Sequence, residues 1–231
     1  DVAYIFNQYH LISCPVVDAG GRLVGVITID DAMNVLDEEH EEDMLRMAGV
    51  GDESSIQDGV LETIKGRIPW LFINLLTANI SALVIGQFAG TIGQIVVLAA
   101  LMPVIASMGG IAGTQSLTIA VRALATRDLT VSNAMRVVRR EAAVGAVNGL
   151  SFAVIMGLAG WLVLGMPMLG VVLALAMIIN LCVAALAGIL VPLAMDRLGF
   201  DPALASGTFV MTVTDVVGFF AFLGLATVML L

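Results

Sequence analysis

An aspartate in the sequence VTDVVG, residues 213–218, is the side chain with the clearest potential for chemistry. Asp215 lies near the middle of an otherwise uncharged run, residues 203–231, that is long enough to cross a bilayer. An ionisable residue at that depth costs about 2.5–3.5 kcal/mol or more on insertion scales, so it normally faces a protein interior or a wet cavity. Helical spacing places it in one stripe with Thr208, Met211, Thr212 and Gly218. We therefore expect Asp215 to face away from lipid.

The charge of Asp215 has no evident basic partner, because no Lys or Arg lies at a similar depth in any apolar stretch. Two interpretations follow. Either desolvation keeps the carboxyl group neutral and it bonds to a hydroxyl such as Thr77 or Thr118, or it is ionised and its partner is a mobile cation. The polar stripe, an interruption expected in the second apolar span and the acidic N-terminal region favour the cation.

A second candidate is the segment PVIASMGGIAGTQS, residues 103–116, within an apolar stretch of 31 residues, 94–124. Pro103 removes a backbone donor, so the segment predicts a break or an unwound turn around residues 103–113. Irregular backbone at membrane depth survives where protein or a water-filled cavity satisfies its polar groups, which makes this segment a candidate pathway wall. The alternative is that its glycines allow close helix packing.

Two further polar groups have structural explanations. Asn74, Thr77 and Ser81 form a stripe that interhelical hydrogen bonds explain equally well. Glu141 follows two arginines, so we favour an interfacial ion pair with Arg139 or Arg140 over a cation vestibule. The candidate cation-binding residues of a membrane pathway are Asp215, Thr212, Met211, Gly110, Gln115 and Glu141.

The elements that must position these residues are membrane helices. The chain has 231 residues, is 59% hydrophobic and has a mean hydropathy of +1.02, well above the roughly half-apolar make-up of soluble domains. Its apolar stretches of spanning length are residues 68–88, 94–124, 142–164, 169–194 and 203–231. Cys14 and Cys182 lack the neighbours of a metal or redox pair. The predicted fold is an all-α membrane domain of five transmembrane helices.

Charge divides the chain and orients it. Residues 1–66 carry 14 acidic and 3 basic side chains, whereas residues 67–231 carry 5 and 7. The basic residues gather before the first span, between the second and third, and between the fourth and fifth: Lys65, Arg67, Arg122, Arg127, Arg136, Arg139, Arg140 and Arg197. The positive-inside rule then predicts a cytoplasmic N-terminal region and an external Leu231. We expect contact with membrane lipid and no nucleic-acid partner.

The N-terminal region predicts a strand, a glycine turn, a second strand and a helix over residues 15–36, with Asp30 or Asp31 as the helix N-cap. The run DEEHEED, residues 37–43, is typical of a solvated helix face, but divalent cations would also neutralise and bridge its carboxylates. A further helix is expected over residues 55–66. The candidate regulatory metal ligands are Asp37, Glu38, Glu41, Asp43, Asp58 and Glu62.

These motifs resemble a known family. The segments PVVD, LVGVIT and DD resemble the second half of a cystathionine-β-synthase-type (CBS) module. The stretches PVIASMGGIAGTQSLTIAVRALATRDL, RREAAVG and DPALASGTFVMTVTDVVGF resemble the C-terminal part of an MgtE-type magnesium transporter. The division is then a partial α/β CBS-like segment at 1–44, an acidic connecting (plug) helix region at 45–66 and a five-helix pore domain at 67–231.

The resemblance implies a homodimer in the cell inner (plasma) membrane, with its pore along the dimer axis and Asp215 of each subunit at a Mg²⁺ site. It also implies that cytoplasmic Mg²⁺ binds between the acidic soluble region and the connecting helix and closes the pore. One residue departs from the family pattern GGNAGTQ, because Ile111 replaces Asn. That change puts ion preference in question.

Other classes fit the residues less well. An aspartyl intramembrane protease needs two carboxylates in one site, and a serine protease of this kind needs a membrane His, whereas His10 and His40 lie in the N-terminal region. We therefore expect no enzyme. The remaining alternatives are a broader divalent-cation transporter and a membrane-anchored cation sensor without transport.

Overall fold

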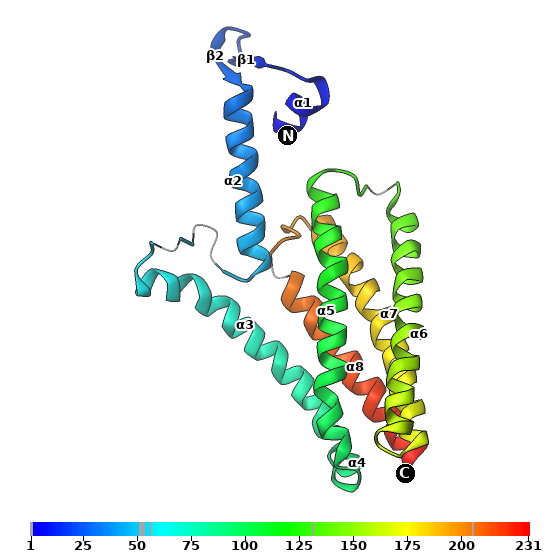
Figure 1. Ribbon diagram of the computed structural model, residues 1–231. Helices are drawn as coiled ribbons and strands as arrows, with labels where there is room; N and C mark the ends of the chain where they lie inside the picture. The colour runs from blue at the N-terminus through cyan, green and yellow to red at the C-terminus, as the bar shows by residue number, and fades with distance from the viewer. Residues whose placement is uncertain (1, 51–53, 56, 131, 205) are drawn as a thin grey trace.

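The computed structural model describes residues 2–50, 54–55, 57–130, 132–204 and 206–231 (Figure 1). Its elements are α1 (Val2–Tyr9), β1 (Ser13–Val17), β2 (Leu23–Thr28), α2 (Ile29–Met47), α3 (Val60–Gln87), α4 (Ala89–Gln94), α5 (Val97–Ala125), α6 (Ala134–Leu162), α7 (Pro167–Arg197) and α8 (Ser206–Leu230). Helices α3, α5, α6, α7 and α8 are long and apolar enough to cross a membrane. The five predicted spans and the fold class are confirmed.

Helices α3, α6 and α7 begin before the apolar stretches that predicted them. Helix α3 begins at Val60 and runs without interruption to Gln87, so the helix expected over residues 55–66 and the first span are largely one element. Helix α6 begins at Ala134, ahead of the apolar stretch at 142–164. Each added residue in a formed helix gains a hydrogen bond, so a helix continues past the apolar boundary into water.

Helix α5 is continuous from Val97 to Ala125, and the predicted break around residues 103–113 is wrong. Its glycines are contact points instead. A methyl group at Gly109 would lie 2.5 Å from Nδ2 of Asn180 on α7, and one at Gly113 would lie 2.7 Å from Val210 on α8. The glycines thus let other helices approach α5 closely, which was the alternative interpretation of this segment.

Helix α7 is the centre of the bundle, because it packs against α5, α6 and α8. Its buried side chains share a core with residues of α5 and α8, including Leu98, Ile105, Leu173, Met177 and Phe222. Glycines bring the backbones together along the α6–α7 interface. A methyl group at Gly160 of α6 would lie 2.5 Å from the Cα of Gly170, near the start of α7.

Helix α3 is the least enclosed spanning helix. It packs mainly against α8 and crosses the bundle at a steep angle, converging with α5 only near α4 (Figure 1). Large apolar side chains along its length are exposed in the single chain, among them Leu71, Phe72, Leu75 and Leu83. Lipid or a second protein surface must cover this face.

The N-terminal region confirms the predicted strand–turn–strand–helix order. Strands β1 and β2 pair antiparallel, from Ser13 opposite Thr28 to Val17 opposite Leu23, with an irregularity between Val16 and Val17. Neither Asp30 nor Asp31 is the N-cap of α2. The cap is Thr28, and Asp31 closes a capping box by accepting from the Thr28 backbone N–H at 3.0 Å. Hydrogen bonds from Thr28 hold the pKa of Asp31 below its usual range.

The C-terminal end of α2 joins the membrane bundle through one ion pair. Arg46 pairs with Asp201 in the α7–α8 connection and also with Glu42, one turn earlier on α2, at 3.0 Å. The second oxygen of Asp201 accepts from the backbone N–H of Ala203 at 2.8 Å. This contact ties the N-terminal region to the segment that leads into α8.

Replacing Gly188 by Ala should destabilise the bundle. The new methyl group would lie 2.6 Å from the Gly113 carbonyl oxygen and 2.9 Å from the Leu117 nitrogen, both backbone atoms of α5. Overpacking of this kind costs about 1–3 kcal/mol. Thermal unfolding in detergent should show a lower midpoint for Gly188→Ala. Gly86→Ala is the matched control, because nothing lies within 4 Å of its added methyl group; equal loss in both variants would contradict the proposed close contact.

Asp201→Asn should loosen the end of α2 without unfolding the bundle. The amide keeps the acceptor for Ala203 and loses the charge that pairs with Arg46. Ion pairs near a surface contribute up to about 1 kcal/mol, so protease cleavage between α2 and α3 should accelerate by up to about fivefold. Glu42→Gln, which removes only the pair within α2, should cleave at close to the unmodified rate. Unchanged cleavage of Asp201→Asn would show that the pair does not hold α2 in place.

Candidate functional site

Asp215 of α8 is half-buried and makes no hydrogen bond or ion pair with any residue that the structure describes. The two hydroxyls considered as partners of a neutral carboxyl group bond elsewhere. Thr77 donates to the backbone oxygen of Asn74 at 3.0 Å, and Thr118 donates to that of Thr114 at 2.9 Å. Neither hydroxyl forms a hydrogen bond with Asp215 in this structure, so the pairing considered for a neutral carboxyl group is not present among the described residues. Its partner is not among the described side chains.

The hydroxyls near Asp215 on α8 bond to their own helix. Thr212 donates to the Thr208 oxygen at 2.7 Å, and the buried Thr214 donates to the Met211 oxygen at 2.9 Å. Each hydroxyl still has lone pairs that could accept a hydrogen bond. Asp215 is thus the single full charge on a segment whose other polar groups are neutral acceptors.

A cavity of about 260 Å³ lies between α5 and α8, one helical turn from Asp215. It is lined by Gly110, Ile111, Thr114, Gln115, Thr118 and Met211. The predicted residues Gly110, Gln115 and Met211 therefore meet, whereas Thr212 and Asp215 lie outside the lining. The side chains of Thr114, Gln115 and Thr118 are exposed on this face of α5. A polar helix face of this kind requires water or another protein surface inside a membrane.

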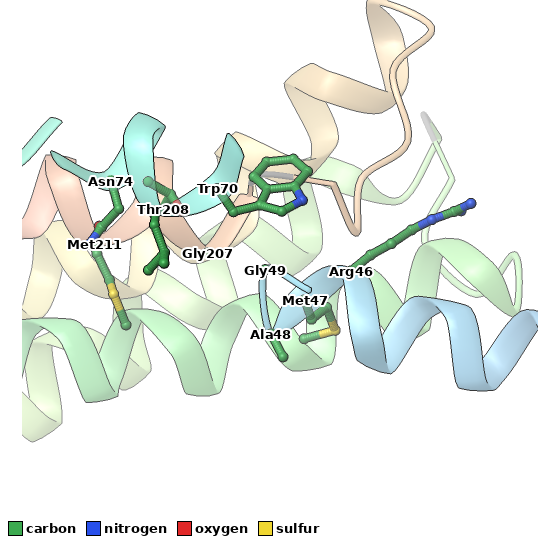
Figure 2. Close-up of a pocket in the computed structure, with 10 residues that line it drawn as sticks. Arg46, Met47, Ala48, Gly49, Trp70, Asn74, Gly207, Thr208 and Met211 are labelled. Atoms are coloured by element: carbon green, nitrogen blue, oxygen red, sulfur yellow. The ribbon is translucent and has the colours of Figure 1, made fainter. Parts of the chain in front are cut away.

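A second cavity, of about 230 Å³, lies where the end of α2 meets α3 and α8 (Figure 2). Figure 2 shows Asn74, Thr208 and Met211 gathered at one end and Arg46 at the other. Trp70 of α3 stands beside Gly49, whose backbone has a φ of +70°. Met211 lines both this cavity and the one between α5 and α8. The two cavities are therefore adjacent along α8, and the end of α2 borders the second of them, the α2–α3–α8 cavity.

Glu141 does not form the predicted ion pair. No salt bridge joins it to Arg139 or Arg140, both of which are described and exposed. Glu141 turns into the bundle, whereas Arg139 and Arg140 are exposed; Arg140 lines the same cavity as Glu141 without forming an ion pair with it. It is only 6% exposed and accepts from the Ser116 hydroxyl at 3.1 Å. Its cavity, about 210 Å³, includes Gln115 and Asn148.

The predicted regulatory residues of the N-terminal region do not converge on one described metal site. Asp37, Glu38 and Glu41 are exposed along α2, while Asp58 and Glu62 accept backbone N–H groups of Ser55 and Gly59 at the start of α3. Within the described part of the chain, no group of three or more His, Cys, Asp or Glu could hold a metal ion. One helix spreads its carboxylates over several faces, which separates them.

Asp43 differs from the other acidic residues of α2, because it is partly buried at the junction with the bundle. Burial and the nearby charge of Asp201 raise its pKa, against the opposing effect of Arg46. Two carboxylates and one guanidinium therefore meet where α2 reaches the α7–α8 connection. Sequence analysis named Asp43 but missed Arg46, Trp70 and Asp201. A glycine at position 49 is a local sign that helix α2 ends there, but the Arg46–Asp201 and Trp70–Gly49 contacts join residues distant in sequence and carry no local signal.

Comparison with known proteins identifies the family. Residues 102–225 match the MgtE family, described as a divalent cation transporter, and residues 1–38 match a CBS domain. The chain is 36% identical over 231 residues to the magnesium transporter MgtE of Enterococcus faecalis, covering 98% of this chain and 50% of that protein. It is 34% identical over 233 residues to MgtE of Thermus thermophilus, covering 100% and 51%, and 30% identical over 227 residues to MgtE of Bacillus subtilis, covering 98% and 50%.

The chain thus spans about half the length of the curated relatives it matches. These relatives are named as transporters. The family match runs from within α5 to within α8. It includes Met211, which lines both cavities, and Asp215, which has no partner among the described residues. With its five apolar helices, this chain is a multi-pass membrane protein that belongs to the MgtE family of divalent cation transporters.

Proposed function

We propose that this chain conducts Mg²⁺ across the cell membrane and that Asp215 binds the ion on its way. The observation that carries the proposal is a half-buried carboxylate, near the middle of a spanning helix, with no partner among the described residues. A charge at that depth needs a counter-charge. A passing cation supplies one. Mg²⁺ is the cargo in this proposal because the curated relatives are named magnesium transporters, and no catalytic activity is part of it.

The pathway is proposed to lie between two copies of the chain. The exposed polar face of α5 and the face of α8 with Met211 and Asp215 need a water-filled or protein-covered environment, and a homodimer with its pore along the axis provides both. The exposed apolar side chains of α3 offer further surface for a partner copy. Isologous symmetry would place the two Asp215 carboxylates on opposite sides of one ion.

The ion is proposed to pass in hydrated form. Mg²⁺ dehydrates reluctantly and usually keeps several of its waters while one or two carboxylates bind it. Gln115 and the Thr212 hydroxyl, with the backbone at Gly110, would accept or donate hydrogen bonds to that water shell. Glu141 lies in a neighbouring cavity that shares Gln115, so its proposed part is a flanking negative charge. Selectivity then depends on cavity size and on the lining donors and acceptors.

Cytoplasmic Mg²⁺ is proposed to close the ion pathway by changing the position of α2. The end of α2 borders the α2–α3–α8 cavity, and the ion pair of Arg46 with Asp201 ties it to the segment that enters α8. No three of the described carboxylates form a metal site in the single chain, so the proposed effect is electrostatic: Mg²⁺ attracted to the acidic region would weaken the repulsion among its carboxylates and change the position of α2 over the cavity. The proposed orientation has the N-terminal region in the cytoplasm and Leu231 outside.

Asp215→Asn should reduce Mg²⁺ flux into vesicles by at least about tenfold, because the amide preserves the shape of the side chain and removes its charge. Flux is measured with an entrapped Mg²⁺-sensitive dye. The control is Asp196→Asn, which neutralises an exposed aspartate near the end of α7 and should leave flux close to normal. Normal flux in Asp215→Asn would rule out this residue as the ion-binding group.

Ile111→Asn should change the order of cation preference. Ile111 is 57% exposed and lines the cavity between α5 and α8, where its apolar side chain can hold no water of an ion's hydration shell. We expect the amide to raise Mg²⁺ flux relative to Mn²⁺, Co²⁺, Ni²⁺ and Ca²⁺ in a vesicle panel, by several-fold. Ile111→Leu, which stays apolar, should keep the original order. An unchanged order in Ile111→Asn would remove the argument for a broader divalent-cation transporter.

A further inference from the structure

Asn180 is a fully buried amide in the middle of α7, with 0% of its surface exposed. Its Nδ2 group donates to the backbone oxygen of Ile105 on α5 at 2.7 Å. This bond fixes which end of the amide is the donor, so Oδ1 is the free acceptor. Among the described residues, Oδ1 has no hydrogen-bond partner. A buried carbonyl without a partner costs free energy, so the surroundings of Oδ1 need an explanation.

Two glycines from two different helices surround Oδ1. A methyl group at Gly109 of α5 would lie 2.8 Å from Oδ1, and a methyl group at Gly218 of α8 would lie 2.9 Å from it. In glycine a hydrogen occupies the position of that methyl group. Both glycines therefore direct a Cα–H bond at the Asn180 amide, the methyl position of Gly109 lying nearest to Nδ2, at 2.5 Å, and that of Gly218 nearest to Oδ1, and Cα–H contacts with an oxygen stabilise close helix interfaces weakly. The amide of Asn180 thus contacts α5 twice and α8 once.

This contact lies beside the proposed ion-binding residue. Gly218 follows Asp215 by three residues, so the two share one side of α8 one turn apart. Gly109 directly precedes Gly110, which lines the cavity between α5 and α8. The contact of Asn180 with Gly109 and Gly218 therefore determines the distance between α5 and α8 near the depth of Asp215.

We propose that Asn180 is a positioning residue for ion conduction: its amide holds α8 at a fixed distance and rotation against α5, and so places Asp215 beside the α5–α8 cavity. This inference rests on the proposed function of Asp215. An apolar side chain would fill the space without a buried carbonyl. The amide adds a directional bond to Ile105 and tolerates only glycine on both sides, which specifies one register of the three helices.

The contact itself is tested by a double-mutant cycle on the full chain in detergent. Gly218→Ala should lower the thermal unfolding midpoint, because its methyl group would lie 2.9–3.1 Å from the Asn180 amide atoms. In the Asn180→Ala background the space of the amide is vacant, so Gly218→Ala should lower the unfolding midpoint by much less. Coupling between contacting residues gives such non-additivity. Equal losses in both backgrounds would overturn the contact, whatever the chain transports.

The positioning role is tested by Mg²⁺ flux in vesicles, normalised to folded protein. Asn180→Ala should lower maximal flux or raise the half-saturating Mg²⁺ concentration by about tenfold, as small misplacements of a binding group do. Leu173→Ala is the control: it truncates another fully buried side chain of α7, two turns earlier, and should lower the unfolding midpoint while leaving half-saturation unchanged. Both flux parameters at normal values in Asn180→Ala would overturn the role.

The two proposals fail in different ways. If the unmodified chain carries no Mg²⁺, the proposed function fails, and the thermal cycle still decides whether Asn180 fixes α8 against α5. If the unmodified chain carries Mg²⁺ and Asp215→Asn does not, while Asn180→Ala behaves like Leu173→Ala, the proposed function stands and this inference fails.

Discussion

The enclosure of α7 by three other helices is the constraint on which the rest of the structure depends. Lipid gives little hydrophobic driving force between membrane helices, so they associate through close packing and a few polar contacts. Glycines supply the close packing here: Gly188 of α7 lies against the α5 backbone, and Gly160 of α6 against that of Gly170. Helices α5 and α8 reach their positions by packing on α7. The placement of Asp215 follows from that arrangement.

The same packing explains why polar groups can exist at this depth. Asn180 and Glu141 are buried, and each has a hydrogen-bond partner on α5, Ile105 for the amide and Ser116 for the carboxylate. Asp215 has none among the described residues. The contrast separates buried polar groups that bond to a neighbouring helix, as Asn180 and Glu141 do, from a charged group that bonds to no described residue.

Much of this fold could be predicted from the sequence, because length and apolarity determine a membrane span, and β-branched residues on both sides of a glycine turn predict the β1–β2 hairpin. The predicted break in α5 failed for a physical reason. Pro and Gly weaken a helix, but whether it opens depends on what lies opposite, and here Asn180 and Val210 fill the space beside Gly109 and Gly113. The isolated charge of Asp215 within an apolar run was visible in the sequence. The junction of Arg46 with Asp201 was not, since 155 residues separate them.

The two contacts of α8 suggest how a change in the N-terminal region would reach Asp215. The connection entering α8 is held by Arg46 through Asp201, while the middle of the helix is held by Asn180 at Gly218. A displacement of α2 would therefore act on one end of a helix whose centre is fixed. Such a helix tilts or rotates about its fixed point, and Met211, which lies between the two contacts and lines both cavities, would move further than Asp215. If α2 closes the pathway as proposed, the closing movement would therefore be larger at Met211 than at the proposed ion-binding carboxylate of Asp215.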